Sequence, residues 1–177
     1  MKNRSRSGGA AEVSLGQQTA SRTEGTAVPR SFASAVIDAP PSVVWDFVKN
    51  FNGTPLYLDL VAESVITDGQ SVDLLGCERV ITLTDGRVVK ETLVARDDIA
   101  RSLTYHLTEG PFPFSNYYST MRVTLISDTG GSFVDWSSVY DCDAVDAEAN
   151  DHLLADQIYG AGLSQIKSRF VPTRTHA

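Results

Sequence analysis

Alternating apolar and polar residues divide most of the chain into short runs. The runs occupy residues 32–37, 62–67, 77–84, 88–96, 102–108, 117–127 and 133–142. Such alternation is typical of strands that bury one face, and turn residues separate the runs. Asp85-Gly86 lies between the third and fourth runs, and an Asp-Gly pair in that position indicates a β-hairpin. The pattern therefore predicts an antiparallel sheet of seven strands.

Two short helices and one long helix are also expected. After the first strand, Ser42 can cap a helix over 43–49, and a second short helix fits 55–60. Apolar residues at spacings of three and four predict a long C-terminal helix over 148–169. The sheet and the helix each have one apolar face to bury, so the sheet is expected to curve around the helix. The predicted fold class is α+β.

Two glycines make the middle of the long helix thin. Gly160 and Gly162 have no side chain to fill the space between helix and sheet. Their position is consistent with close packing of the helix against the sheet. It is equally consistent with room left for a ligand, and the sequence leaves both interpretations open.

The first thirty residues lack the alternating pattern. All fifteen aromatic residues lie at or beyond Phe32, and residues 1–30 are mainly small, polar or basic. Such a segment buries too little apolar surface to offset its ordering entropy, so we expect a disordered tail over 1–30. It lacks the apolar run of a secretory signal and the amphipathic face of a transit peptide. The folded domain is expected over 31–170, followed by a C-terminal tail over 171–177.

The charge of the chain argues against nucleic acid as a partner. The formal net charge is -7, although the first thirty residues hold five basic and only two acidic residues. The acidic folded part repels phosphate backbones. No run approaches the roughly 18 apolar residues of a membrane-spanning helix. Cys77 and Cys142 form neither a CxxC pair nor a disulfide framework, so we expect reduced, buried cysteines in a cytoplasmic protein.

Sequence motifs for common cofactors and nucleophiles are missing. The chain contains no GxGxxG, P-loop or GxSxG motif, which disfavours nicotinamide, nucleotide and covalent serine chemistry. His152 and Asp156 share a helical face, but no third metal ligand accompanies them. We therefore expect neither a metal nor another cofactor. The pattern does not determine the oligomeric state.

Strand alternation also predicts which side chains face the long helix. The candidate ligand-binding residues are Arg79, Ile81, Leu83, Leu107, Glu109, Phe112, Ser119, Trp136 and Ile158, and the candidate catalytic residues are Glu91, Tyr105 and Tyr117. A mostly apolar set with a few polar groups is typical of a small-molecule pocket. A register error of one residue would reverse each strand's inward face.

The polar members of this set have more than one interpretation. Arg79 and Glu91 lie on neighbouring strands and can form a structural ion pair, or Arg79 can bind a ligand oxyanion while Glu91 accepts a proton. Tyr105 and Tyr117 can polarise a ketone or can pack with their hydroxyls bonded to the protein. Trp136 is expected to anchor the core. The loop that carries Phe112 and Phe114 can cover the cavity mouth or pack in place.

Short motifs in the same order resemble the START-like, SRPBCC superfamily, whose helix-grip fold is also that of the Bet v-like proteins. The motifs are Ala39-Pro40-Pro41-Ser42-Val43-Val44-Trp45, Gly76-Cys77-Glu78-Arg79, Glu109-Gly110-Pro111 and Asn116-Tyr117-Tyr118-Ser119. They are most similar to bacterial polyketide cyclase/dehydrase-type proteins and more distantly to plant abscisic-acid receptors. Ala62 replaces the receptor lysine that holds the hormone, and a tight turn at 84–87 replaces the gate loop. An abscisic-acid receptor is therefore disfavoured.

The resemblance implies a hydrophobic small molecule as the partner and supports two main hypotheses. In the first, the protein is a cofactor-independent cyclase or dehydratase of secondary metabolism. Glu91 or Glu109 would then move a proton while Tyr105, Tyr117 or Arg79 stabilises an enolate oxygen. In the second, the protein is a non-catalytic carrier or sensor of an apolar small molecule. A third class, a protein-interaction module with a vestigial cavity, also fits the fold.

Overall fold

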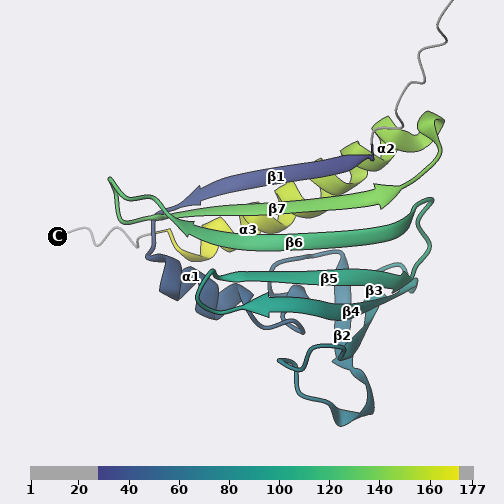
Figure 1. The fold of residues 1–177 in the computed structure, drawn as a ribbon, viewed down its shortest axis with the longest axis horizontal. Coiled ribbons are helices and arrows are strands. Elements are labelled where there is room, and N and C mark those ends of the chain that lie inside the picture. Colours follow the sequence, from purple (N-terminus) through teal and green to yellow (C-terminus); the bar gives the residue numbers. More distant parts are fainter. Residues whose placement is uncertain (1–27, 172–177) are drawn as a thin grey trace, which may run out of the picture.

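The computed structural model describes residues 28–171, in which a curved antiparallel sheet wraps around one long helix (Figure 1). The strands are β1 (Arg30–Ile37), β2 (Val61–Ile66), β3 (Glu78–Leu83), β4 (Val88–Asp97), β5 (Ser102–Glu109), β6 (Ser115–Leu125) and β7 (Ser132–Asp141). Their order across the sheet is β1-β7-β6-β5-β4-β3-β2, so β1 and β2 are the two edges. The predicted α+β helix-grip fold is confirmed. The predicted tails lie almost wholly outside the described residues.

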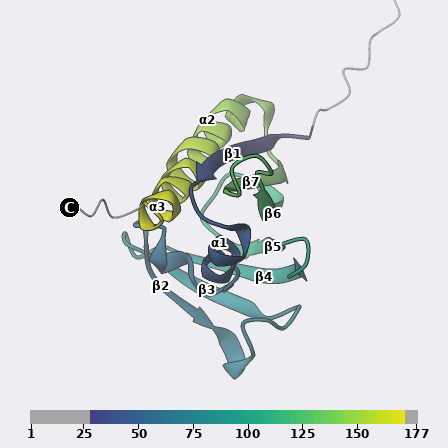
Figure 2. The ribbon, with the colours of Figure 1, turned by 90° about the vertical axis from the view of Figure 1, so that its left-hand side faces the viewer.

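The long helix lies on the concave side of the sheet. In the view turned by 90°, the strands follow one curved surface from β1 to β2, with α1 (Pro41–Val48) and α3 (Ala161–Arg169) on its inner side (Figure 2). Side chains alternate across this surface, and the buried positions of β3 to β7 are those that the sequence pattern predicts. The inner face of the sheet and the helices therefore enclose a single core.

The predicted cap of the first helix is wrong. Pro40 occupies the N-cap position, the helix begins at Pro41, and no side chain within residues 28–171 caps it. Proline suits the first helical position because its φ is already helical and it has no N–H that needs a partner. The carbonyl oxygen of Pro40 instead accepts bonds from the N–H groups of Val43 and Val44, at 3.0 and 3.2 Å. Ser42 is therefore not needed as a cap.

Three short 3-10 segments differ from the prediction. One replaces a longer predicted helix, and two occur where no element was predicted. The predicted second helix is a single turn, η1 (Thr54–Leu56). Two further segments, η2 (Thr67–Gly69) and η3 (Ala144–Asp146), follow β2 and β7. The backbone shape of η1 is fixed by two hydrogen bonds, because the N–H groups of Tyr57 and Leu58 both donate to the carbonyl oxygen of Thr54.

The long helix is not α-helical throughout. It runs through α2 (Ala147–Asp151), the π-helical segment η4 (His152–Gly160) and α3. A π-helix bonds each N–H to the carbonyl five residues earlier and so takes more residues per turn than an α-helix. The buried residues of η4 are Leu154 and Tyr159, which lie five positions apart. The π-helix therefore turns Tyr159 into the core, where spacings of three and four predict Ile158.

Gly162 allows α3 to approach the sheet closely. A Cβ atom added at Gly162 would lie 2.9 Å from Cζ3 of Trp136 and 3.0 Å from Cδ2 of Leu58. Trp136 is fully buried, and its ring stacks on that of Tyr159 with centroids 4.8 Å apart. At Gly160, an added Cβ would approach only the carbonyl oxygen of Ala155. The missing side chain at Gly162 therefore allows the helix to pack closely against Trp136 and Leu58, and it does not leave room for a ligand there.

Replacing Gly162 with alanine is expected to lower the free energy of unfolding by about 1–2 kcal/mol, because overpacking outweighs the gain in helix propensity. Trp136 cannot retreat without losing its stack on Tyr159 and its indole hydrogen bonds. Urea unfolding of Gly162→Ala measures the change, with Gly160→Ala as the control expected to stay near the wild type. Equal stability of the two variants would contradict the packing argument.

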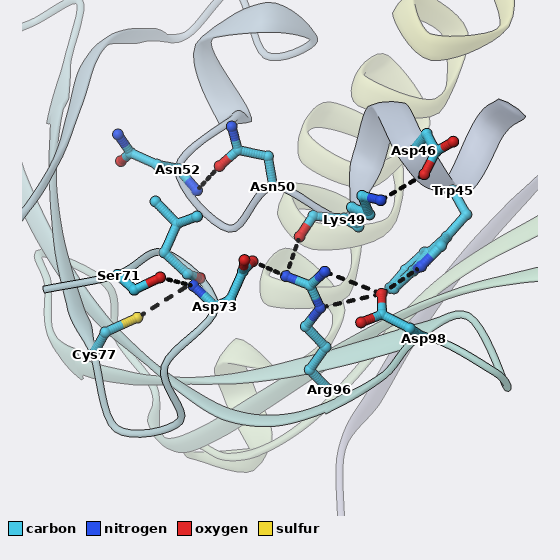
Figure 3. A network of polar contacts seen from close by, with 11 residues as sticks. Trp45, Asp46, Lys49, Asn50, Asn52, Ser71, Asp73, Cys77, Arg96 and Asp98 are labelled. Carbon is cyan, nitrogen blue, oxygen red and sulfur yellow. Dashed lines mark hydrogen bonds and ion pairs between the residues drawn. The ribbon is translucent and has the colours of Figure 1, made fainter. Parts of the chain in front are cut away.

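A polar cluster links α1 and the loop that precedes β3 to the C-terminal end of β4 (Figure 3). The guanidinium of Arg96 bonds to the carboxylates of Asp73 and Asp98, and the indole Nε1 of Trp45 donates to Asp98 at 2.8 Å. Hydrogen bonds from Arg96 and then Trp45 hold the pKa of Asp98 below its ordinary value. Arg96 also donates to the carbonyl oxygen of Lys49, just after α1. The cluster helps to position α1 and hence η1, which follows it.

Candidate ligand-binding site

An internal cavity lies between the concave face of the sheet, η1, the β5–β6 loop and η4. Its volume is about 60 Å³. Its lining comprises Thr54, Leu58, Leu60, Val61, Arg79, Ile81, Leu83, Val89, Glu91, Tyr105, Leu107, Phe112, Phe114, Tyr117, Trp136, Leu154 and Ile158. All the predicted site residues except Glu109 and Ser119 are in this set. The structure therefore brings most of them together around one cavity.

Glu109 and Ser119 do not line the cavity. Glu109 is exposed, and its carboxylate pairs with the ammonium of Lys90 at 2.5 Å. The pairing of β4 with β5 shifts between Lys90 and Glu91, and this irregularity separates Glu109 from the inward-facing residues. Ser119 is fully buried behind the cavity wall, where its hydroxyl accepts from Trp136 Nε1 and donates to the carbonyl oxygen of Ser137.

Arg79 and Glu91 form a buried ion pair in the cavity wall. Arg79 Nε and Nη2 lie 2.7 and 2.5 Å from Glu91 Oε2, and the two residues are 3% and 7% exposed. Burial opposes the charge on Arg79, but Glu91 and the nearby tyrosines outweigh that effect and raise the pKa of the guanidinium. The ion pair therefore favours the charged guanidinium, and the two opposite formal charges lie together in the cavity wall.

The remaining contacts of Arg79 are also made within the protein. Nη1 donates to the carbonyl oxygen of Phe51. The guanidinium lies over the rings of Phe51 and Tyr105, at 4.1 and 5.0 Å from their centroids. Such cation–π contacts add to the attraction of the ion pair when the site is dry. The geometry is that of an arginine held by the fold.

Buried tyrosine hydroxyls supply the other polar groups. Trp136 Nε1 donates to the hydroxyl of Tyr105 at 3.0 Å. Because an indole N–H only donates, Tyr105 keeps its own proton for another acceptor. The hydroxyls of Tyr117 and Tyr159 are 2.5 Å apart. Burial raises the pKa of all three tyrosines, to about 12 for Tyr159, so each is protonated at neutral pH.

Phe112 lies between the cavity and a second hollow at the surface. The second hollow has a volume of about 270 Å³ and shares Leu60, Leu83, Phe112 and Ile158 with the inner cavity. The rings of Phe112 and Phe114 stack with centroids 5.1 Å apart. A cavity that holds benzene measures roughly 150 Å³, so a ring-sized ligand needs the shared wall to move. Phe112 belongs to the β5–β6 loop, so this loop is the part of the shared wall that we expect to move.

Two polar residues at the site were missed by the sequence analysis, Thr54 in the lining and Tyr159, whose hydroxyl contacts that of the lining residue Tyr117. The predicted site residues also do not include the apolar lining residues Leu58, Leu60, Val61, Val89, Phe114 and Leu154. Tyr159 was missed because its burial depends on the π-helix, which a search for spacings of three and four does not detect. Thr54 was missed because it lies in a turn with no periodic pattern. It is 2% exposed, and its hydroxyl has no hydrogen-bond partner within residues 28–171.

The described residues contain neither a cluster that could hold a metal ion nor a helix that could span a membrane. Residues 28–171 contain no group of three or more His, Cys, Asp or Glu side chains that could hold a metal ion. His152 and Asp156 form an exposed pair at 2.7 Å. Over the same residues, no helix has the length and apolar character required to cross a bilayer. Cys77 is buried as expected, whereas the expected burial of Cys142 is wrong because it is only half-buried; both are free thiols.

Comparison with known proteins gives one family and several solved structures. The family model described as polyketide cyclase / dehydrase and lipid transport matches residues 30–171. The protein XoxI from Bacillus cereus is 28% identical with a TM-score of 0.73, over 83% of this chain and 99% of its own. An uncharacterized Bacillus thuringiensis protein is 29% identical with a TM-score of 0.71, over 81% and 99%. A Thermobifida fusca protein is 27% identical with a TM-score of 0.73, over 80% and 93%. No curated protein matches the chain.

Proposed function

The chain belongs to the polyketide cyclase / dehydrase and lipid transport family, and on this premise we propose that it binds an apolar small molecule in the cavity beside the long helix. The observation that carries the proposal is the lining. Its side chains are mainly aliphatic and aromatic, and the few polar groups converge from η1, β3, β4, β5 and β6. This combination suits a ligand that is buried by apolar contacts and oriented by a few hydrogen bonds.

The finer proposal is a cyclase or dehydratase that works by general acid–base catalysis without a cofactor. Both Arg79 contacts go to Oε2 of Glu91, and within residues 28–171 its Oε1 makes no hydrogen bond. Oε1 would take a proton from a carbon next to a ketone, and the hydroxyl of Tyr105 would donate to the resulting enolate oxygen. The enolate carbon would attack a second carbonyl of the same chain. Glu91 would then return its proton to the alkoxide formed at that carbonyl. In the dehydration, Glu91 would remove the remaining proton from the attacking carbon, a C=C bond would form as hydroxide leaves, and Glu91 would protonate the hydroxide to water.

One observation favours the alternative of a non-catalytic carrier or sensor. Glu91 is already paired with a buried guanidinium, and an adjacent cation stabilises the carboxylate and makes it a weaker base. The ion pair would then contribute to the cavity wall without taking part in proton transfer. The same apolar lining would hold the ligand in either case. Turnover of the bound molecule separates the two functions.

Native mass spectrometry of the protein purified from its own producer tests the proposed binding. We expect a co-purifying small molecule that denaturing extraction releases. Leu107→Trp, which fills the cavity from β5, should abolish it, whereas Val139→Trp on the exposed face of β7 should retain it. An empty wild-type protein that also shows no thermal shift across a panel of hydrophobic compounds would contradict the proposal and favour an interaction module.

A further inference from the structure

The charges that line the cavity are already balanced. Among the described residues that line the cavity, Arg79 and Glu91 alone have ionic side chains, and they pair with each other. An anionic ligand would place a second carboxylate beside a single guanidinium. It would also lose its hydration on entering an apolar site, which is unfavourable for a charge that gains no partner. The electrostatics therefore select against a charged ligand.

Each nitrogen of the Arg79 guanidinium already contacts an oxygen of the protein. Its Nε and Nη2 contact Glu91, its Nη1 contacts the carbonyl oxygen of Phe51, and aromatic rings flank the guanidinium plane. A ligand carboxylate that bound Nε and Nη2 side by side would have to displace Glu91. Displacement would leave the carboxylate of Glu91 buried without its cation, which is among the costliest changes in a protein interior.

Thr54 offers the hydrogen-bonding group that Arg79 does not. It lines the cavity from η1, it is 2% exposed, and its Oγ1 has no partner among the described residues. A buried hydroxyl without a partner is unfavourable, so a ligand atom that bonds to it recovers the lost interaction. A hydroxyl can donate to a ketone oxygen and can accept from an alcohol.

We propose that the ligand is uncharged and that its ketone or hydroxyl oxygen is held by the hydroxyl of Thr54. This inference rests on the proposed function, because it requires a ligand in the same cavity. It assigns Thr54 as a determinant of specificity and Arg79 as part of the wall. An uncharged cyclic or aromatic ketone is the simplest molecule with these properties.

Three probes of matched shape test the inference. Acetophenone is a neutral ketone, α-methylstyrene replaces its oxygen with a methylene group, and benzoate is the corresponding anion. Binding to the ¹⁵N-labelled protein is followed by NMR titration, which measures weak affinities directly. We expect the Kd of acetophenone to be about five- to tenfold lower than those of the other two probes. Thr54→Val should remove the preference over α-methylstyrene, and Thr54→Ser should retain it.

The outcomes separate this inference from the proposed function. If α-methylstyrene or benzoate binds the wild type as tightly as acetophenone, the inference is wrong while a ligand-binding cavity remains. An unchanged preference in Thr54→Val, with wild-type thermal stability, also overturns it. The comparison of probes on the wild type needs no variant, so a misfolded variant does not affect it. If no probe binds the wild type at millimolar concentration, both proposals fail.

Discussion

Replacing Arg79 with methionine is expected to lower the free energy of unfolding at pH 7 by about 3–5 kcal/mol, which is typical when one partner of a buried ion pair is removed. The substitution leaves the carboxylate of Glu91 7% exposed and without its cation. Methionine retains most of the apolar volume of the arginine side chain, so the loss reports on the lost charge and on the lost hydrogen bond to the carbonyl oxygen of Phe51. Urea unfolding at pH 7 measures it. Arg87→Met, on the same hairpin but in an exposed pair with Asp85, should stay close to the wild type.

A double variant separates the lost charge pairing from the other contacts of Arg79. The double variant Arg79→Met/Glu91→Leu should recover most of the loss. A full loss in the double variant would show that charge is not the cause.

Glu91→Gln is expected to reduce turnover of the molecule recovered from the cavity by about 10²–10⁴-fold, which is the usual contribution of a general base. Glutamine keeps the shape of the side chain and can still accept from Arg79, but its amide does not take up a proton at neutral pH. The affinity for the molecule should change little if the pocket is intact. Single-turnover measurements by mass spectrometry give the rate, and binding is measured separately by calorimetry.

Glu109→Gln is the matched control for that experiment. Both candidate carboxylates occur in the same hairpin region, but Glu109 is exposed and paired with Lys90, so its replacement should leave turnover unchanged. Unchanged turnover in Glu91→Gln would exclude Glu91 as the base. A bound molecule that the wild type does not convert would support the carrier or sensor. A rate lost equally in both variants would contradict the assignment of the base to the cavity.

The sheet and its inner face are the parts that sequence reasoning predicts well. Alternation of apolar and polar residues has a period of two, and each run of β3 to β7 is long enough to specify its phase. The turn at Asp85-Gly86 also follows from composition, because Gly86 has a φ of 86°, which glycine adopts easily. Arg79 and Glu91 therefore fall on the same side of neighbouring strands, and their backbone positions pair across β3 and β4.

The remaining details depend on irregularities that carry no periodic signal. The inward position of Tyr159 requires a π-helix, whereas the pattern is interpreted with α-helical spacing. The outward position of Glu109 follows a register shift between two strands, which depends on both strands together. Thr54 is placed by a single 3-10 turn. Each of these residues is positioned by tertiary structure, so a single-sequence pattern predicts only its neighbourhood.

The pairing of β1 with β7 has a consequence for how the chain folds. The hydroxyls of Ser31 and Tyr140, which join these strands at 3.1 Å, belong to residues 109 positions apart. Such a contact closes a loop that contains residues of all seven strands of the sheet, and its entropy cost is met before the strand pair contributes stability. A sheet completed by so distant a pair is expected to fold on the scale of milliseconds to seconds. During synthesis, β1 can pair with β7 only after this last strand of the sheet has left the ribosome.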